Sequence, residues 1–173
     1  MSAVIHWFRR DLRLTDNAAL NAALTSGLPV IPLFIFDERI IRSERSGAPR
    51  IAFLLKALHA LDGTLRQHNS RLLIRFGEPT SILRQLVHDT NAQAIYFNRD
   101  YSPAARKRDE QVTHNSDVLV YAYDDALLLA PGTVMKDDGT PYTVFTPFKK
   151  RWLTLAKTPF DAELPRGRFH TLD

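Results

Sequence analysis

Cysteine and long hydrophobic runs are absent from this chain of 173 residues. Without cysteine there can be no disulfide bond, no zinc–thiolate site and no cysteine nucleophile, and we expect a reducing, cytoplasmic location. The longest apolar run covers residues 28–36 and contains two prolines. A membrane-spanning helix needs about 20 apolar residues, so we expect no membrane partner.

The usual phosphate-binding loops are also missing. No G-x-G-x-x-G follows the first apolar run, and no G-x-x-x-x-G-K-[ST] occurs anywhere in the chain. A conventional NAD or nucleoside-triphosphate site is therefore not expected. The six histidines show no metal-ligand spacing, and no serine lies in a nucleophile elbow. We expect neither a metal site nor catalytic residues in this chain.

The remaining composition is that of a globular domain. Hydrophobic residues make up 45% of the chain and charged residues 24%, which excludes a disordered or fibrous protein. A length of 173 residues is enough for one domain with a buried core. The formal net charge of +4 is too small to indicate nucleic-acid binding by itself.

Five short apolar runs alternate with helical patterns. The runs are nearly continuous in hydrophobicity, which is typical of parallel strands that helices cover on both faces. Strand, helix and strand repeated in this way predict an α/β fold, namely a Rossmann-like, doubly wound sheet of five parallel strands flanked by helices. The predicted strands cover residues 3–8, 29–36, 71–76, 94–97 and 118–121.

Proline and capping residues mark where the predicted helices begin. Asp16 is the expected N-cap of the first helix, which ends near Gly27. The next three helices are expected to begin at Pro49, Pro79 and Pro103, because the first turn of a helix does not need the N–H group that proline lacks.

The alternation of apolar runs and helical patterns weakens after the fifth predicted strand. Residues 1–130 are expected to form the core of the α/β domain, and residues 131–157 a closing segment of the same domain. Residues 158–173 contain proline and glycine without clear periodicity. They are expected to be the start of a linker to another domain.

A cluster of arginine and aspartate, in residues 7–17, lies in the turn between the first predicted strand and the first helix. Strand ends that lead into helices are where open α/β sheets bind ligands. We interpret Asp11 and Arg13 as ion-pairing residues that rigidify this loop. Arg10 is the member of the cluster that remains a candidate ligand-binding residue.

Two basic runs occur later in the chain, Arg106-Lys107-Arg108 and Lys149-Lys150-Arg151. Both are interpreted as solvated helix faces, because runs of like charge rarely pack inside a domain. Contacts of the second run with DNA phosphates or with a further domain are the alternative.

Two segments resemble one known family. Residues 6–20, HWFRRDLRLTDNAAL, closely resemble the start of DNA photolyases and cryptochromes. Residues 139–152, GTPYTVFTPFKKRW, resemble the segment that closes the N-terminal α/β domain of these proteins. In that family the N-terminal domain binds a light-harvesting antenna chromophore. A larger C-terminal helical domain, absent here, binds FAD and the damaged pyrimidine dimer.

The resemblance implies the antenna domain of a deoxyribodipyrimidine photolyase, similar to class I photolyases that repair cyclobutane pyrimidine dimers. The complete enzyme is a carbon–carbon lyase that flips the lesion out of the duplex toward the flavin. This chain alone is not expected to catalyse repair, and its expected partners are the antenna, the helical FAD domain and damaged DNA. The alternatives are the antenna domain of a cryptochrome photoreceptor and a stand-alone nucleotide-binding α/β protein.

The resemblance also bears on the identity of the antenna. Folate-binding members carry an Asn-Glu pair at the start of the fourth long helix, where this chain has Ala104-Ala105. A buried pterin would lack polar partners there, at a cost of about 1–3 kcal/mol for each unpaired group. We therefore favour 8-hydroxy-5-deazaflavin or FMN over methenyltetrahydrofolate.

Members that bind a deazaflavin or FMN use a pocket at the carboxyl ends of the first, second and fourth strands. The matching cofactor-binding residues in this chain are Arg10, Phe36, Asp37, Arg50 and Asp100. Aromatic and aliphatic side chains suit a flat ring, carboxylates suit ring N–H or ribityl hydroxyl groups, and arginine suits a phosphate. Arg50 in a first helical turn opposes the helix dipole, which favours an acidic ligand or partner.

Overall fold

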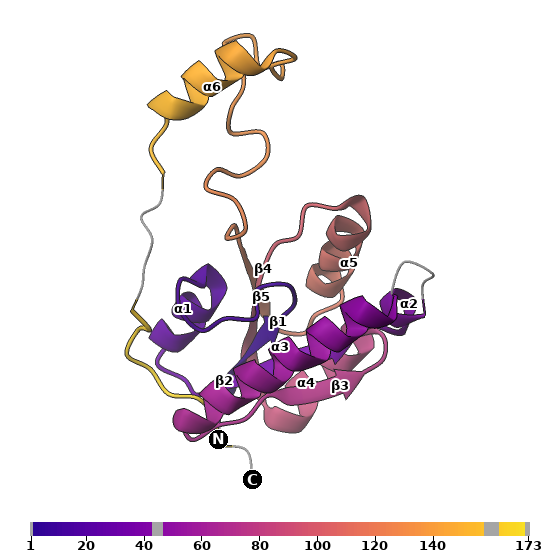
Figure 1. Cartoon of the computed structure of the whole chain (residues 1–173). Helices are drawn as coiled ribbons and strands as arrows, with labels where there is room; N and C mark the ends of the chain where they lie inside the picture. The colour runs from indigo at the N-terminus through magenta and orange to yellow at the C-terminus, as the bar shows by residue number, and fades with distance from the viewer. Residues whose placement is uncertain (1, 43–46, 158–162, 172–173) are drawn as a thin grey trace.

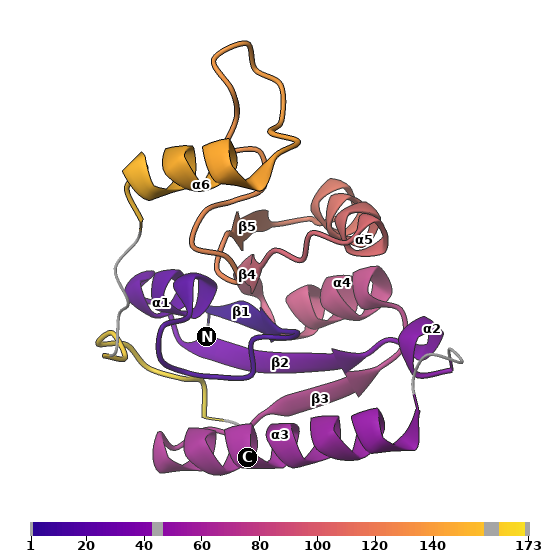
Figure 2. The same cartoon turned by 45° about the horizontal axis from the view of Figure 1, so that its top comes forward.

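Five parallel strands form one sheet in the order β3-β2-β1-β4-β5, which confirms the predicted α/β architecture. The computed structural model describes residues 2–42, 47–157 and 163–171. Figure 2 shows the sheet between its covering helices. The strands are β1 (Ala3–Phe8), β2 (Val30–Phe36), β3 (Leu73–Phe76), β4 (Ala92–Asn98) and β5 (Leu119–Tyr123).

Helices cover both faces of the sheet because alternate residues of the central strand point to opposite sides. In β1, Val4 and Phe8 pack with α1 and α3, whereas Ile5 and Trp7 pack with α4 and α5. This arrangement produces two hydrophobic cores, one on each face. The helices are α1 (Ala18–Thr25), α2 (Glu38–Ile41), α3 (Ala48–Gln67), α4 (Pro79–Thr90), α5 (Pro103–His114) and α6 (Phe145–Thr154).

The predicted N-cap of α1 is wrong by one residue. Asn17 is the cap, with an extended backbone and a side-chain oxygen that accepts from the Leu20 N–H group at 3.0 Å. Asp16 precedes it with φ at +50°, a left-handed conformation that aspartate tolerates better than most residues. The Asn17 amide also donates to the Asp11 carboxylate and to the Arg13 carbonyl, which a carboxylate at this position could not do.

Two helices lie outside the sequence predictions. Helix α2 spans only four residues and is capped by Asp37, which lies directly after β2. Helix α6 lies in the predicted closing segment, and none of its residues is buried. Figure 1 shows α6 apart from the sheet, beyond the carboxyl ends of β4 and β5. None of the helices within the described ranges is long and apolar enough to cross a membrane.

The described part of the C-terminal segment, residues 163–171, packs against the amino end of the sheet. Phe169 pairs with Val30 in a parallel bridge and is 8% exposed within the core next to α1 and α3. The Val30 N–H group donates to the Arg168 carbonyl at 3.0 Å, and the His170 N–H group donates to the Val30 carbonyl at 2.7 Å. The predicted linker thus contributes a core residue, while residues 158–162, 172 and 173 of that linker lie outside the described residues.

His6 is a titratable group at the centre of β1. Its side chain is fully buried against the ring of Phe8, and both ring nitrogens lack a hydrogen-bond partner among the described residues. Burial lowers the pKa of His6 to about 4, opposed by the Asp11 carboxylate and reinforced by Arg9. His6 is therefore neutral in the folded chain at neutral pH.

Acidification is expected to destabilise the fold through His6. Below pH 6.5 the unfolded chain binds a proton at this residue, whereas the folded chain does not until about pH 4. The free energy of unfolding should therefore fall by about 2–3 kcal/mol more between pH 7.5 and pH 4.5 in the wild-type chain than in His6→Leu. Urea denaturation of both chains at the two pH values measures this difference. Equal pH dependence in the two chains would contradict it.

Candidate functional site

A buried polar network joins the carboxyl ends of β1 and β4. The Asn98 amide donates to an Asp11 carboxylate oxygen at 2.6 Å and to the Asn17 side-chain oxygen at 2.8 Å. Asn17 is completely buried and Asn98 is 5% exposed. Because buried amides and carboxylates are costly unless paired, these contacts fix the first loop to the end of β4.

The same network occupies the N-terminus of α1, where doubly wound folds commonly bind a phosphate. Three side-chain oxygens accept from consecutive N–H groups of the first turn. Asp125 accepts from Ala18 at 2.9 Å, and Asn98 accepts from Ala19 at 3.0 Å. The third acceptor is the capping oxygen of Asn17. With these donors occupied, the N-terminus of α1 does not provide an anion site.

The expectation that Asp11 and Arg13 rigidify the first loop through ion pairs agrees with the ion pairs of Arg13, whereas Asp11 accepts hydrogen bonds from a backbone N–H group and amide side chains. Asp11 accepts from the Arg9 N–H group at 3.0 Å in addition to its bond from Asn98. Arg13 pairs with Asp125 at 2.9 Å and also donates to the backbone carbonyl of Asp16. Together these contacts rigidify the loop between β1 and α1.

Arg9 is buried at the end of β1 on the opposite face from α1. Its guanidinium carbon lies 5.0 Å from the centre of the Trp7 ring and 4.6 Å from that of Phe97. Two hydrogen bonds, of 2.5 and 3.2 Å, join it to the Asp109 carboxylate of α5, and it also donates to the Asn98 carbonyl. Arg9 therefore fastens α5 to the strand ends.

Asp100 and Arg10, both predicted to bind the cofactor, come together at the end of β4. Arg10 Nη1 lies 3.3 Å from Asp100 Oδ2, and the Arg10 side chain is 82% exposed. The other Asp100 oxygen accepts from the Ser102 N–H group at 3.0 Å. Burial raises the pKa of Asp100, but the Ser102 and Arg10 hydrogen bonds outweigh this effect and hold the pKa below its usual value. Asp100 is an ionised carboxylate at neutral pH.

Asp37 lies directly after β2, at the edge of the sheet where the carboxyl ends of the parallel strands lie. Its carboxylate accepts from the Arg39 backbone and pairs with the Arg39 guanidinium at 2.8 Å. Burial raises the pKa of Asp37, but these bonds and the positive charges of Arg39 and Arg108 lower it further than burial raises it. The Asp37 and Asp100 carboxylates in turn act to raise the pKa of Arg108, against the larger lowering by burial.

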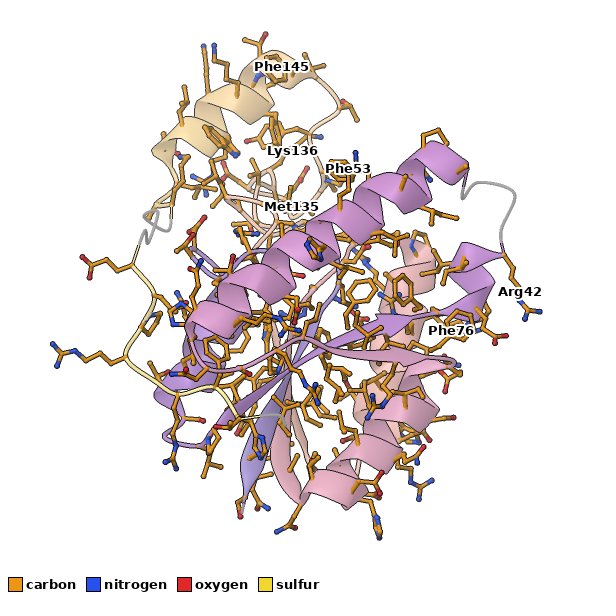
Figure 3. All side chains as sticks on the ribbon, turned by 60° about the horizontal axis from the view of Figure 1, so that its bottom comes forward. Arg42, Phe53, Phe76, Met135, Lys136 and Phe145 are labelled. Carbon is orange, nitrogen blue, oxygen red and sulfur yellow. The ribbon has the colours of Figure 1, made fainter. Side chains whose placement is uncertain are left out.

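Phe36 and Arg50 belong to the other face of the sheet. Phe36 is half-buried, with its ring centre 5.0 Å from that of Phe34 in an edge-to-face contact, and it borders the core beneath α3. Arg50 is exposed in the first turn of α3. Figure 3 shows Phe53 farther along α3 and Phe76 at the end of β3 that lies near α2. These two aromatic side chains are 74% and 52% exposed.

The interpretation of Arg106-Lys107-Arg108 as a solvated face is wrong for Arg108. The Arg108 side chain is 14% exposed, and its guanidinium carbon lies 5.3 Å from the centre of the Trp7 ring. Helical spacing could have indicated this, because Arg108 lies four residues before Val112, which is buried on the same side of α5. The sequence reasoning therefore missed Arg108 as a functional candidate.

A groove lies on another side of α5. It has a volume of about 840 Å³ and includes Asp100, Tyr101, Arg106 and Asp109. Burial and the Asp124 carboxylate, which accepts from Tyr101 at 2.9 Å, raise the pKa of Tyr101 to about 12. Asp100 is the one member of the predicted cofactor set in this groove. Among the described residues, no group of three or more His, Asp or Glu is placed to hold a metal ion.

Comparisons with known proteins agree on one family. A family model described as DNA photolyase matches residues 4–166. A deoxyribodipyrimidine photo-lyase of Synechococcus is 36% identical over 152 residues, which are 86% of this chain and 31% of that protein. Cryptochrome-2 of Gallus gallus is 38% identical over 108 residues, which are 62% of this chain and 19% of that protein.

A solved structure has the same fold. It is an archaeal photolyase from Sulfolobus tokodaii with two FAD molecules, described as implying a novel light-harvesting cofactor. The two chains share 32% sequence identity with a TM-score of 0.83, and the match covers 98% of this chain and 38% of that one. This chain therefore spans about a third of the length of these photolyases.

Loss of the Asn98 side chain is expected to destabilise the fold strongly. Asn98→Ala leaves the Ala19 N–H group and an Asp11 oxygen without their buried partners, so the free energy of unfolding should fall by about 3 kcal/mol. Gln93→Ala, in the exposed part of the same strand, is the control and should change it by less than about 0.5 kcal/mol. Urea denaturation measures both, and similar losses in the two variants would refute the structural role of the network.

Proposed function

Because the chain belongs to the DNA photolyase family, which it matches over residues 4–166, we propose that it is the light-harvesting antenna domain of a deoxyribodipyrimidine photolyase. The observation that carries this proposal is the group of charged side chains at the carboxyl ends of β2 and β4, Asp37 and Asp100, with Arg10 paired to the latter. In open α/β sheets ligands bind at this edge. When bound, the antenna absorbs light and passes excitation energy to a catalytic flavin.

The residues of this edge fit a flavin-like antenna. Asp37 and Asp100 are both ionised acceptors, since their hydrogen bonds hold their pKa values below the usual range. They would accept from ring N–H or ribityl hydroxyl groups. Phe36 would contact the flat ring, and Arg10 and Arg50 would bind acidic groups of the chromophore. The five predicted cofactor-binding residues thus supply hydrogen-bond acceptors, an aromatic surface and positive charges.

The same residues fit a folate less well. Helix α5 begins at Pro103, and the two following positions are Ala104, which is exposed, and Ala105, which is 4% exposed. Neither side chain can hydrogen-bond to a pterin. Leaving pterin donors unpaired would cost about 1–3 kcal/mol for each group. The preferred antenna is therefore 8-hydroxy-5-deazaflavin or FMN, rather than methenyltetrahydrofolate.

The repair activity would belong to the longer protein. We propose that a helical domain binds FAD and the damaged DNA, and that light-driven cleavage of cyclobutane pyrimidine dimers takes place there. The 38% identity with an avian cryptochrome over 108 residues supports a second candidate, the antenna domain of a photoreceptor. A repair assay on the product of the complete gene separates the two, because only the photolyase would restore dimer-containing DNA under blue light.

Binding of FMN to this chain tests the proposed antenna site. Addition of the 173-residue chain should quench or shift the fluorescence of FMN, and Arg50→Ala should weaken binding about tenfold by removing one charge-assisted contact. Lys56→Ala is the control, because it removes one positive charge from the exposed surface of the same helix. Fluorescence titrations of the three chains give the dissociation constants.

Two results would contradict the proposal. Unchanged FMN and 8-hydroxy-5-deazaflavin spectra at high protein concentration would argue against an antenna site in this domain. Tighter binding of methenyltetrahydrofolate than of either flavin would overturn the inference from Ala104 and Ala105.

A further inference from the structure

The outer edge of β5 is an uncharged, apolar strand. Within the described residues β5 pairs only with β4, and Figure 2 shows it at one edge of the sheet. Residues 118–123, VLVYAY, contain neither a charged residue nor proline. Leu119 and Tyr121 are 64% and 39% exposed. Proteins usually protect an edge strand with charge or proline, so a strand without either is expected to have a partner.

The backbone groups of this edge are available for hydrogen bonds. The Tyr123 carbonyl accepts from the Arg99 N–H group at 2.8 Å, so the backbone groups of Tyr123 face β4. Successive residues of a strand direct their backbone groups to opposite edges, so those of Val120 and Ala122 point away from β4. In the parts of the chain that the structure describes, these two residues form no hydrogen bond on that side. An extended segment can therefore pair with β5 through its backbone.

The opposite edge of the sheet differs from β5. It is formed by β3, which has only four residues and carries the exposed Arg75. A short edge strand with a charged side chain resists pairing with another strand. The two edges of this sheet are thus unequal, and β5 is the one suited to accept a partner.

The sequence of β5 is complementary to itself. When two copies of the strand lie antiparallel about a two-fold axis at Val120, Val118 lies opposite Ala122 of the other copy. In the same register Leu119 lies opposite Tyr121, so the two exposed side chains of the strand cover each other. Cross-strand pairs of an aromatic and an aliphatic side chain stabilise a sheet. No charged side chain of residues 118–123 is buried by this pairing.

Tyr121 is already ordered for such a contact. Its ring stacks on that of Tyr96, with the ring centres 4.9 Å apart and the planes 25° apart. Tyr96 is itself 8% exposed and stacks on Tyr123 as well, with ring centres 6.5 Å apart. A side chain that is held in place before binding loses little conformational entropy when a partner covers it.

We propose that β5 binds a second copy of this chain and that the two sheets join through antiparallel β5 strands. The partner is a second copy because one strand supplies both members of each side-chain pair, as a two-fold interface requires. The carboxyl ends of the two sheets then point in opposite directions, so the candidate sites lie on opposite sides of the joined sheet. This inference does not depend on the proposed antenna function.

Cysteine substitutions test the register, because the chain has no cysteine of its own. Val120→Cys places both thiols at the two-fold axis, where paired strands hold their Cα atoms about 5.5 Å apart, within the range of a disulfide. Val118→Cys is the matched control, because its two copies lie roughly 13 Å apart in this register. On mild oxidation Val120→Cys should form a covalent dimer, as measured by non-reducing electrophoresis, and Val118→Cys should not.

Sedimentation equilibrium measures the association without a covalent bond. The wild-type chain should be mostly dimeric at about 100 µM, because short interfaces bind weakly. Leu119→Lys should weaken dimerisation by about tenfold or more, since lysine on an edge strand opposes pairing. Ile74→Lys is the control on the β3 edge, where Ile74 is 45% exposed, and it should dimerise like the wild-type chain. Circular dichroism checks that each variant is folded.

Three results would overturn the proposal. A wild-type chain that stays monomeric at this concentration would exclude a second copy as the partner of β5. Equal cross-linking of Val120→Cys and Val118→Cys would contradict the register. A dimer that Ile74→Lys disrupts and Leu119→Lys leaves intact would assign the interface to β3 instead of β5.

Discussion

The Asn98 side chain connects three parts of the molecule that are distant in sequence. It donates to Asp11 in the first loop and to Asn17 at the α1 cap, and it accepts from the first turn of α1. Each of these groups is costly to bury alone, so the contacts form together or not at all. The network thereby holds the loop after β1 against the end of β4, at the point where the strand order changes direction.

This network closes a position that doubly wound folds commonly offer to a ligand. Doubly wound sheets usually offer the N-terminus of the first helix to a phosphate, but here side-chain oxygens of Asn17, Asn98 and Asp125 occupy its donors. Guanidinium groups lie instead on the opposite face, where Arg9 and Arg108 are over Trp7. In the proposed antenna function, an acidic chromophore would depend on side chains for its recognition, because the backbone amides at the start of α1 are occupied.

The sheet could be predicted from the sequence because buried parallel strands are nearly continuous apolar runs. Helix starts at prolines were predicted to within a residue, as in α4 at Pro79 and α5 at Pro103. Contacts between distant residues could not be predicted in the same way. The cap at Asn17, the burial of Arg108 and the core position of Phe169 each depend on an element far along the chain. The predicted cofactor residues were identified by family resemblance, since spacing alone does not reveal which strand ends meet.

Both tryptophans of the chain lie close to cations. Trp7 lies beneath the guanidinium groups of Arg9 and Arg108, and the Lys157 ammonium is 4.1 Å from the centre of the Trp152 ring. The emission energy of an indole depends on the electric field across its ring, and a cation over one end of the ring shifts it. Trp7 is therefore an optical reporter near the end of β1, because its emission wavelength depends on the positive charges of Arg9 and Arg108. Trp152, on α6, supplies a separate signal from the exposed closing segment.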